Sequence, residues 1–194
     1  MLQWLNNKYP EFWKKYISSF KEKSDRYVVL SIESTGLNTS KDVILAISAV
    51  TIMNNRMIVK DALELYISHT KSEIEINQNE FLLVSKVAKK AESEAIELLI
   101  NFIGNATIIG HRVYQDIELL NASLSKLGCG KLKNEALDIE IMFNKVKDTI
   151  DKKYALEEMS TYFSVPVNDR ISVADDTFSI AILFLKLKTI LKIK

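Results

Sequence analysis

The sequence is poor in the residues that build disulfides, thiolate metal sites and flexible linkers. Its 194 residues include one cysteine, Cys129, two prolines and five glycines. A lone cysteine excludes an internal disulfide and a zinc site built on several thiolates, and such low cysteine usage is typical of cytoplasmic proteins. No Gly- or Pro-rich linker, repeat or low-complexity tract divides the chain. We therefore expect a cytoplasmic protein with one core, since a domain usually takes ~100–200 residues.

The chain also lacks a charge excess and a long hydrophobic run. Its 26 Lys and Arg residues and 25 Asp and Glu residues leave a net charge of +1, so any nucleic-acid partner must be bound at a local site. The N-terminus has no apolar stretch of the kind found in signal peptides. The most apolar run, residues 178–185, is interrupted by Lys186 and Lys188 well before the ~20 residues that cross a bilayer. This run predicts a buried helix and no membrane partner.

An aromatic stripe lies near the N-terminus. Pro10 and Glu11 form a good helix start, and apolar side chains then recur at helical spacing, at Phe12, Trp13, Tyr16, Ile17 and Phe20. Two interpretations stay open: the aromatic face packs on the chain's own domain, or it docks a protein partner. We expect residues 1–24 to form this amphipathic helical leader and residues 25–194 to form the domain that follows it.

The sequence of the main domain predicts three strands followed by an alternation of strands and helices. Residues 27–32 are apolar and β-branched, as in a strand buried on both faces. Strands over 43–53 and 57–66 follow, joined by a turn at Asn54-Asn55. Two more strands are expected over 106–109 and 136–141, and helices over 87–102, 115–127, 156–163 and 175–191. This order predicts an α/β protein whose mixed five-stranded sheet, three antiparallel strands and then two parallel ones, is flanked by helices and similar to that of ribonuclease H.

Three carboxylates stand at the ends of these elements. Glu33 ends the first strand, Asp116 follows the fourth, and Asp175 begins the last helix. In open α/β sheets the ligand crevice lies at the carboxyl ends of the strands, so these side chains can converge there. Clustered carboxylates favour a hard cation such as Mg²⁺ or Mn²⁺. Taken singly, each is also explained as a helix cap or a solvated charge.

Four segments resemble the motifs of the DEDD superfamily of 3′-to-5′ exonucleases, which includes the proofreading subunit of DNA polymerase III and RNase T. Residues 31–37 are similar to the first motif, Asp-x-Glu-x-Thr-Gly-Leu, and residues 110–116 to the second, Gly-His-Asn-x-x-x-Asp. Residues 136–138 resemble the strand that bears an additional aspartate, and residues 170–176 resemble the third motif, His-x-Ala-x-x-Asp-Ala. The resemblance implies a ribonuclease H-like fold and an exonuclease-like domain over residues 25–194.

The resemblance also implies roles for individual residues. The acidic ligands of divalent ions correspond to Glu33, Asp116 and Asp175. Thr35 and Leu37 match positions that contact the terminal nucleotide. Arg112 replaces the asparagine of the second motif, where it binds a phosphate or pairs with Asp116. The supporting positions behind the ligands are Asp138 and His111.

Two catalytic positions depart from the superfamily pattern. Ser31 stands where the first aspartate bridges two ions, and Arg170 stands where a histidine acts as general base. A serine supplies only a neutral hydroxyl, and a permanently protonated arginine binds phosphate but accepts no proton from water. The site is therefore expected to hold one Mg²⁺ or Mn²⁺ ion or none, rather than two. Loss of a general base alone costs ~10²–10⁴ in rate.

These observations favour a protein that binds single-stranded 3′ ends of DNA or RNA with weak or lost catalysis. One alternative is an active metal-dependent 3′-to-5′ exonuclease with an altered site. The other is a non-catalytic interaction subunit that uses the leader helix with Phe12, Trp13 and Tyr16, in which case the crevice is vestigial.

Overall fold

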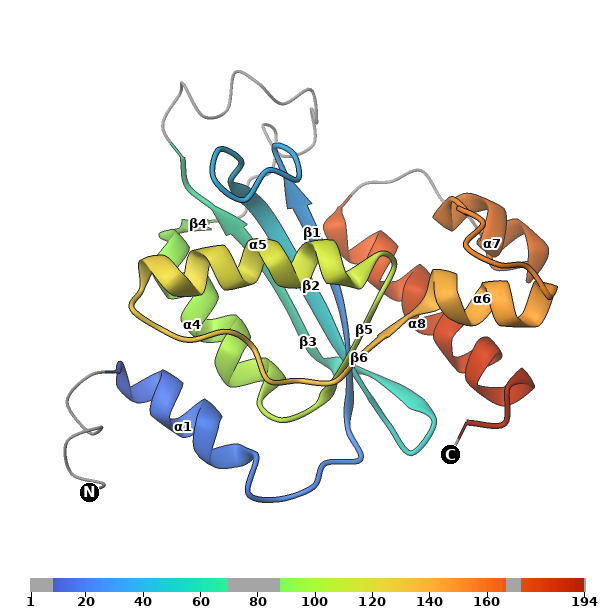
Figure 1. Ribbon diagram of the computed structural model, residues 1–194, viewed down its shortest axis with the longest axis horizontal. Helices are drawn as coiled ribbons and strands as arrows, with labels where there is room; N and C mark the ends of the chain where they lie inside the picture. The colour runs from blue at the N-terminus through green and yellow to red at the C-terminus, as the bar shows by residue number, and fades with distance from the viewer. Residues whose placement is uncertain (1–8, 70–87, 167–171, 194) are drawn as a thin grey trace.

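The computed structural model describes residues 9–69, 88–166 and 172–193. One mixed sheet lies at its centre, with helices on both faces (Figure 1). The strands form the order β4-β3-β2-β1-β5-β6 and span Tyr27–Ser34 (β1), Ile44–Met53 (β2), Arg56–Ile67 (β3), Lys89–Lys90 (β4), Thr107–Gly110 (β5) and Ala136–Asp138 (β6). The helices span Glu11–Ser19 (α1), Glu92–Ile103 (α4), Val113–Lys126 (α5), Ile139–Lys147 (α6), Leu156–Tyr162 (α7) and Val173–Ile190 (α8). Among these described helices none is long and apolar enough to cross a membrane.

The pairing of β1 gives the sheet its mixed direction. β1 runs antiparallel to β2 and parallel to β5, and β5 is parallel to β6. β2 and β3 form the predicted hairpin, whose turn residues Asn54 and Asn55 have φ angles of 54° and 56°. Asparagine tolerates this left-handed backbone better than most residues, as a two-residue hairpin requires. The predicted order of three antiparallel strands and two parallel ones is confirmed.

Several element boundaries differ from the sequence prediction. β4 pairs in parallel with the end of β3, so a sixth strand is present and the helix expected from residue 87 begins at Glu92. The strand expected over 136–141 ends at Asp138, because the Asp138 side chain accepts a hydrogen bond from the Glu140 backbone N–H and caps α6. The last helix begins at Val173, two residues early, with Ser172 as its cap.

Different helices cover the two faces of β1. Val28 and Leu30 belong to a core shared with α1, α4 and α5, whereas Val29 belongs to a core shared with α6, α7 and α8. Figure 1 shows these two groups of helices on opposite sides of the sheet. Side chains of a strand alternate between its faces, so Ser31 and Glu33 lie on the same face as Val29, the one that α8 covers.

The leader helix α1 packs on the domain that follows it. Trp13 and Tyr16 are buried in the core shared with α4 and α5. The Tyr16 hydroxyl donates to Asn134 Oδ1 at 2.7 Å and accepts from the Lys133 backbone N–H at 2.7 Å. Burial raises the pKa of Tyr16 to about 12. Of the two interpretations of the leader, the structure shows packing on the chain's own domain, which leaves Trp13 and Tyr16 inaccessible to a partner.

Candidate functional site

Three parallel strands end at the same edge of the sheet. Val29 of β1 is level with Ile109 of β5, and Gly110 of β5 is level with Asp138 of β6. Glu33 lies near the end of β1, and Asp138 ends β6. Ligands of open α/β sheets bind at the carboxyl ends of the parallel strands. This edge therefore carries the candidate site.

A pair of serines occupies the position next to Glu33 on the α8 face. Ser31 of β1 lies directly opposite Ser48 of β2 in the antiparallel register. Ser31 is 8% exposed and Ser48 is 2% exposed. Residues that face each other across an antiparallel pair share one face of the sheet, so both hydroxyls lie beneath α8. The position where the resemblance requires a carboxylate thus holds neutral groups only.

The loop after β1 is held by an aspartate that the sequence did not single out. Asp42 Oδ1 accepts a hydrogen bond from the Thr35 hydroxyl at 2.9 Å, and Thr35 Oγ1 accepts from the Val43 backbone N–H at 3.1 Å. A Cβ at Gly36 would lie 2.6 Å from Asp42 Oδ2, so a larger residue there would require the Asp42 side chain to move. Thr35 is therefore engaged in building the loop, whereas Leu37 is 58% exposed and presented to solvent.

Asp116 and Asp138 form a second group at this edge, where α5 begins. Asp138 Oδ2 accepts from the Val113 backbone N–H at 3.1 Å, and Asp138 Oδ1 accepts from the Glu140 backbone N–H at 2.9 Å. These amides belong to the first turns of α5 and α6 and give each Asp138 carboxylate oxygen a donor. Partial burial, together with the nearby Asp138 carboxylate, raises the pKa of Asp116 well above its ordinary value. The pair therefore favours one charge rather than two.

The first turn of α8 brings Asp175 to the neighbourhood of β1. Val173 belongs to a small buried cluster with Ala46, which is the residue of β2 opposite Glu33. Asp175 Oδ2 accepts from the Ser172 backbone N–H at 2.8 Å, so this carboxylate closes a capping box at the start of the helix. Of the two interpretations of Asp175 made from the sequence, the structure shows the helix cap, and its role as a metal ligand stays a prediction.

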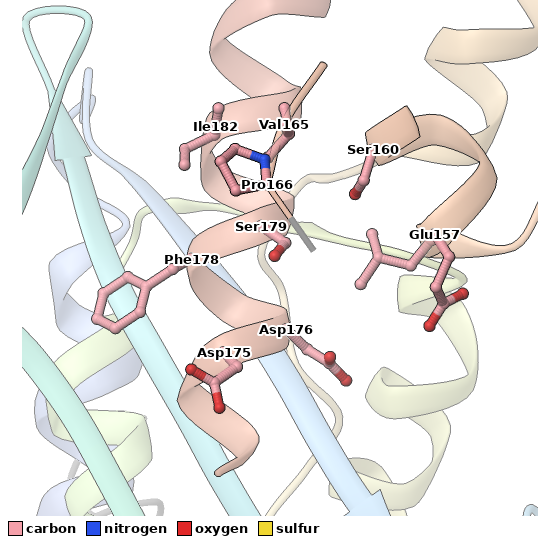
Figure 2. Close-up of a pocket in the computed structure, with 10 residues that line it drawn as sticks. Glu157, Ser160, Val165, Pro166, Asp175, Asp176, Phe178, Ser179 and Ile182 are labelled. Carbon is pink, nitrogen blue, oxygen red and sulfur yellow. The ribbon is translucent and has the colours of Figure 1, made fainter. Parts of the chain in front are cut away.

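A cavity of about 250 Å³ lies between α7 and α8. Figure 2 shows Asp175 and Asp176 projecting in different directions from the first turn of α8, with Glu157 and Ser160 of α7 across the cavity. No group of three or more His, Cys, Asp or Glu side chains within the described ranges could hold a metal ion. The residues described therefore do not fit a two-ion centre. Arg170 lies in residues 167–171, outside the described ranges.

Glu140 ties the second motif to the segment after α6. Its buried carboxylate accepts from the Tyr154 backbone N–H at 2.8 Å, from Arg112 Nη2 at 3.2 Å and from Lys153 Nζ at 3.3 Å. Burial alone would raise the pKa of Glu140, but these partners outweigh it and lower the pKa. Of the two alternatives for Arg112, the pairing with Asp116 is wrong, because its partner is Glu140, and phosphate binding stays a prediction. This pairing could not be predicted from the sequence, because the expected strand over 136–141 included Glu140, which lies in α6.

His111 has a structural contact in the same network. Its Nε2 atom lies 2.9 Å from the Tyr154 backbone oxygen and 3.8 Å from Glu140 Oε1. The ring therefore links the end of β5 to the start of α7. The supporting role that the resemblance implies for His111 stays a prediction.

Comparison with known proteins yields matches across most of the chain. The family described as RNase_T, Exonuclease, matches residues 28–184. A DNA polymerase III PolC-type protein of Pediococcus pentosaceus is 28% identical over 169 residues, which are 84% of this chain and 12% of that protein. The DNA polymerase III subunit epsilon of Aquifex aeolicus is 24% identical over 161 residues, 83% of this chain and 79% of the subunit. The chain thus spans only a small part of the PolC-type relative.

Among solved structures, the fold matches a zinc-bound complex of E. coli exonuclease I with single-stranded DNA. The TM-score is 0.68 at 12% identity, over 86% of this chain and 41% of the exonuclease chain. At this identity the likeness concerns the fold, and it agrees with the ribonuclease H-like sheet described above.

Proposed function

Because the chain belongs to the RNase_T exonuclease family, we propose that it binds single-stranded 3′ ends of DNA or RNA and hydrolyses them weakly or not at all. The observation that carries this proposal is the buried Ser31–Ser48 pair, which places two neutral hydroxyls where the first motif of such exonucleases has a carboxylate. The fold and the loop after β1 support binding, and the altered acidic set opposes catalysis.

The binding half of the proposal rests on the edge where β1, β5 and β6 end. Leu37 is exposed beside Thr35, on a loop that Asp42 holds in one conformation. A rigid loop with an exposed apolar side chain is suited to contact a terminal base, since its ordering cost is already met in the free protein. The single-stranded DNA in the exonuclease I complex gives the chemical class of ligand.

The proposed loss of catalysis rests on the reduced negative charge of the site. Exonucleases of this family use divalent metal ions. Here the carboxylates expected to hold a cation are Glu33, Asp116 and Asp175, and Ser31 takes the place of a fourth. Because Ser31 adds no charge, we place one Mg²⁺ or Mn²⁺ ion or none in this site. Arg170, at the position of the histidine, stays protonated and cannot act as general base.

One experiment tests both parts of the proposal, the binding of a single strand and the loss of hydrolysis. The protein is incubated with a 5′-labelled single-stranded oligonucleotide in Mg²⁺, Mn²⁺ or EDTA, and binding and digestion are followed together. We expect binding in all three conditions and digestion orders of magnitude slower than that of an intact relative. Rapid Mg²⁺-dependent digestion that disappears in Glu33→Ala would show that the protein is an active exonuclease.

A further inference from the structure

Next to the acidic edge lies a cavity that combines cations with exposed apolar side chains. It measures about 480 Å³; Asp138 and Glu140 form its floor, and Arg112, Tyr114, Ile141 and Lys153 surround its mouth. We propose that this cavity binds a phosphodiester and an adjacent base of a single-stranded nucleic acid, as a subsite beside the position of the strand end. This inference rests on the proposed function and names a second region of the chain that holds the strand.

The two acids on the floor are already satisfied by partners within the protein. Asp138 accepts hydrogen bonds from the Val113 and Glu140 amides at 3.1 and 2.9 Å. Glu140 accepts from the Tyr154 amide and from both cations. The helix-terminal amides offset the charge of Asp138, and one carboxylate faces two cations above it. The two carboxylates and the two cations balance in formal charge, but the carboxylates are buried and the cations are exposed. A phosphodiester that enters from solvent therefore meets the cations first.

Both cations keep donors that Glu140 does not use. Arg112 binds Glu140 through Nε and Nη2, and its Nη1 makes no hydrogen bond within the described ranges. The Arg112 side chain is 41% exposed, and that of Lys153 is 76% exposed. A guanidinium offers five N–H donors and an ammonium three, so several donors remain directed outward. Glu140 thus holds one cationic group at each of its two carboxylate oxygens, and both groups keep donors that a phosphate can use.

The aromatic ring beside these cations decides between nucleic acid and another anion. Tyr114 is 54% exposed on the first turn of α5, and its hydroxyl lies 3.4 Å from the Ala136 backbone oxygen. Ile141, across the cavity on α6, is 49% exposed. Exposed aromatic rings next to cations are the stacking platforms of proteins that bind single strands. An acidic peptide would use the cations but has no need of the ring.

The cavity shares a wall with the acidic edge. Asp138 lines the cavity and interacts electrostatically with Asp116, two residues after Tyr114 on α5. A strand whose 3′ end lies near Glu33 and Asp116 therefore meets Arg112 and Lys153 as it leaves the edge. Arg112 has a left-handed backbone, with φ of 56°, which turns the chain sharply between β5 and α5 at this point.

The subsite is tested by equilibrium binding in EDTA, where no metal-dependent cleavage interferes. Fluorescence anisotropy of a labelled oligothymidylate is measured across a salt series for the wild type and for Lys153→Ala, Tyr114→Ala and Tyr114→Phe. We expect Lys153→Ala to lower the slope of log Kd against log salt by about 0.7, the value for one phosphate contact on a single strand. Tyr114→Ala should weaken binding about tenfold, and Tyr114→Phe should retain it, because stacking requires the ring alone.

Lys131→Ala serves as the matched control, since Lys131 is an exposed lysine next to Gly130, which packs against Trp13 on the α1 side of the molecule. It should leave both the affinity and the salt slope unchanged. Wild-type protein that binds no oligonucleotide overturns the proposed function together with this subsite. Wild-type protein that binds normally while Lys153→Ala and Tyr114→Ala have no effect overturns the subsite alone. The subsite is also overturned if these variants lose binding to an oligoglutamate peptide but not to the oligonucleotide.

Discussion

Ser31 of β1 lies directly opposite Ser48 of β2, and both side chains are buried on the face that α8 covers. A carboxylate introduced at this point would face a hydroxyl and lie two residues from Glu33 on the same strand face. A single substitution at Ser31 can therefore change the net charge at this edge of the sheet.

Restoring both altered positions should restore metal-dependent cleavage. Ser31→Asp combined with Arg170→His is expected to digest a single-stranded oligonucleotide in Mn²⁺ about 100-fold faster than either single variant, because the aspartate supplies a metal ligand and the histidine a base. The effects should exceed the sum of the single changes. A time course of digestion on gels measures the rates. If the double variant gains neither cleavage nor stabilisation by Mn²⁺, the crevice has been remodelled.

Ser31→Asn separates charge from size in the same experiment. Asparagine has the shape of aspartate without its charge, so Ser31→Asp should be less stable than Ser31→Asn in EDTA. Added Mn²⁺ should raise the melting temperature of Ser31→Asp more than that of Ser31→Asn, since only the aspartate adds an ionised ligand to the folded state. A thermal melt with and without Mn²⁺ gives both comparisons.

Glu140→Gln should destabilise the protein by about 1.5 kcal/mol at neutral pH, because hydrogen bonds to a charged acceptor are replaced by weaker ones. The lowered pKa of Glu140 means that its carboxylate stabilises the fold above the ordinary carboxyl pKa, and that this stabilisation is lost as the pH falls through the folded-state pKa. Urea denaturation of both proteins at neutral pH and below about pH 4 measures the effect. A difference that grows in acid would contradict the assignment of Glu140 as the ionised partner of Arg112 and Lys153.

Asp116→Asn should stabilise the metal-free protein at neutral pH. The raised pKa of Asp116 means that the folded state binds a proton which the unfolded state has already released. Stability therefore falls as the pH rises from the ordinary carboxyl pKa through the raised one, and the asparagine variant should lack this decline. Free energies of unfolding from about pH 4 upward, measured in EDTA, test the sign. Asp138→Asn is the contrasting variant, since it removes the acceptor for two backbone amides and should destabilise.

Asp175→Ala should lower the free energy of unfolding by about 1 kcal/mol, because it opens the capping box at the start of α8. Asp175→Asn keeps an oxygen that accepts from the Ser172 N–H and should lose less. Ser172→Ala removes the other half of the box and should cost a similar amount to Asp175→Ala. Chemical denaturation of the three variants at low salt compares them, and an Asp175→Ala variant as stable as the wild type would show that the cap contributes little.

Most of the sheet could be predicted because the local sequence of each longer strand has a strand pattern. The apolar run of β1 and the Asn54-Asn55 turn were sufficient to place the first three strands. The residues Ile139, Glu140 and Ile141 alternate like a strand, and only the cap from Asp138 makes them a helix. β4 consists of two lysines, Lys89 and Lys90, that pair with the end of β3. These residues have no strand pattern of their own, so β4 depends on its pairing with β3.

Only part of the candidate site could be predicted, again because only local patterns are visible in the sequence. Motif spacing located the edge where Glu33 and Asp138 lie, since element ends follow from local signals. The partners of those residues depend on contacts between segments far apart in sequence. Asp42 behind Thr35, and Glu140 beneath Arg112, became visible only in three dimensions. Whether Glu33, Asp116 and Asp175 act together remains a prediction, which the Mn²⁺ experiments address.

The hydrogen bonds around the Tyr16 hydroxyl affect how the protein unfolds. Asn134 accepts from the Tyr16 hydroxyl and donates to the backbone oxygens of Gly104 and Ala106 at 2.9 and 2.7 Å, so α1 is fastened to the connections on either side of β5. A helix fastened in this way should not detach while the sheet stays intact. Amide hydrogens of α1 should then exchange with deuterium at the same rate as those of α4, and the leader and the sheet should unfold as one cooperative unit.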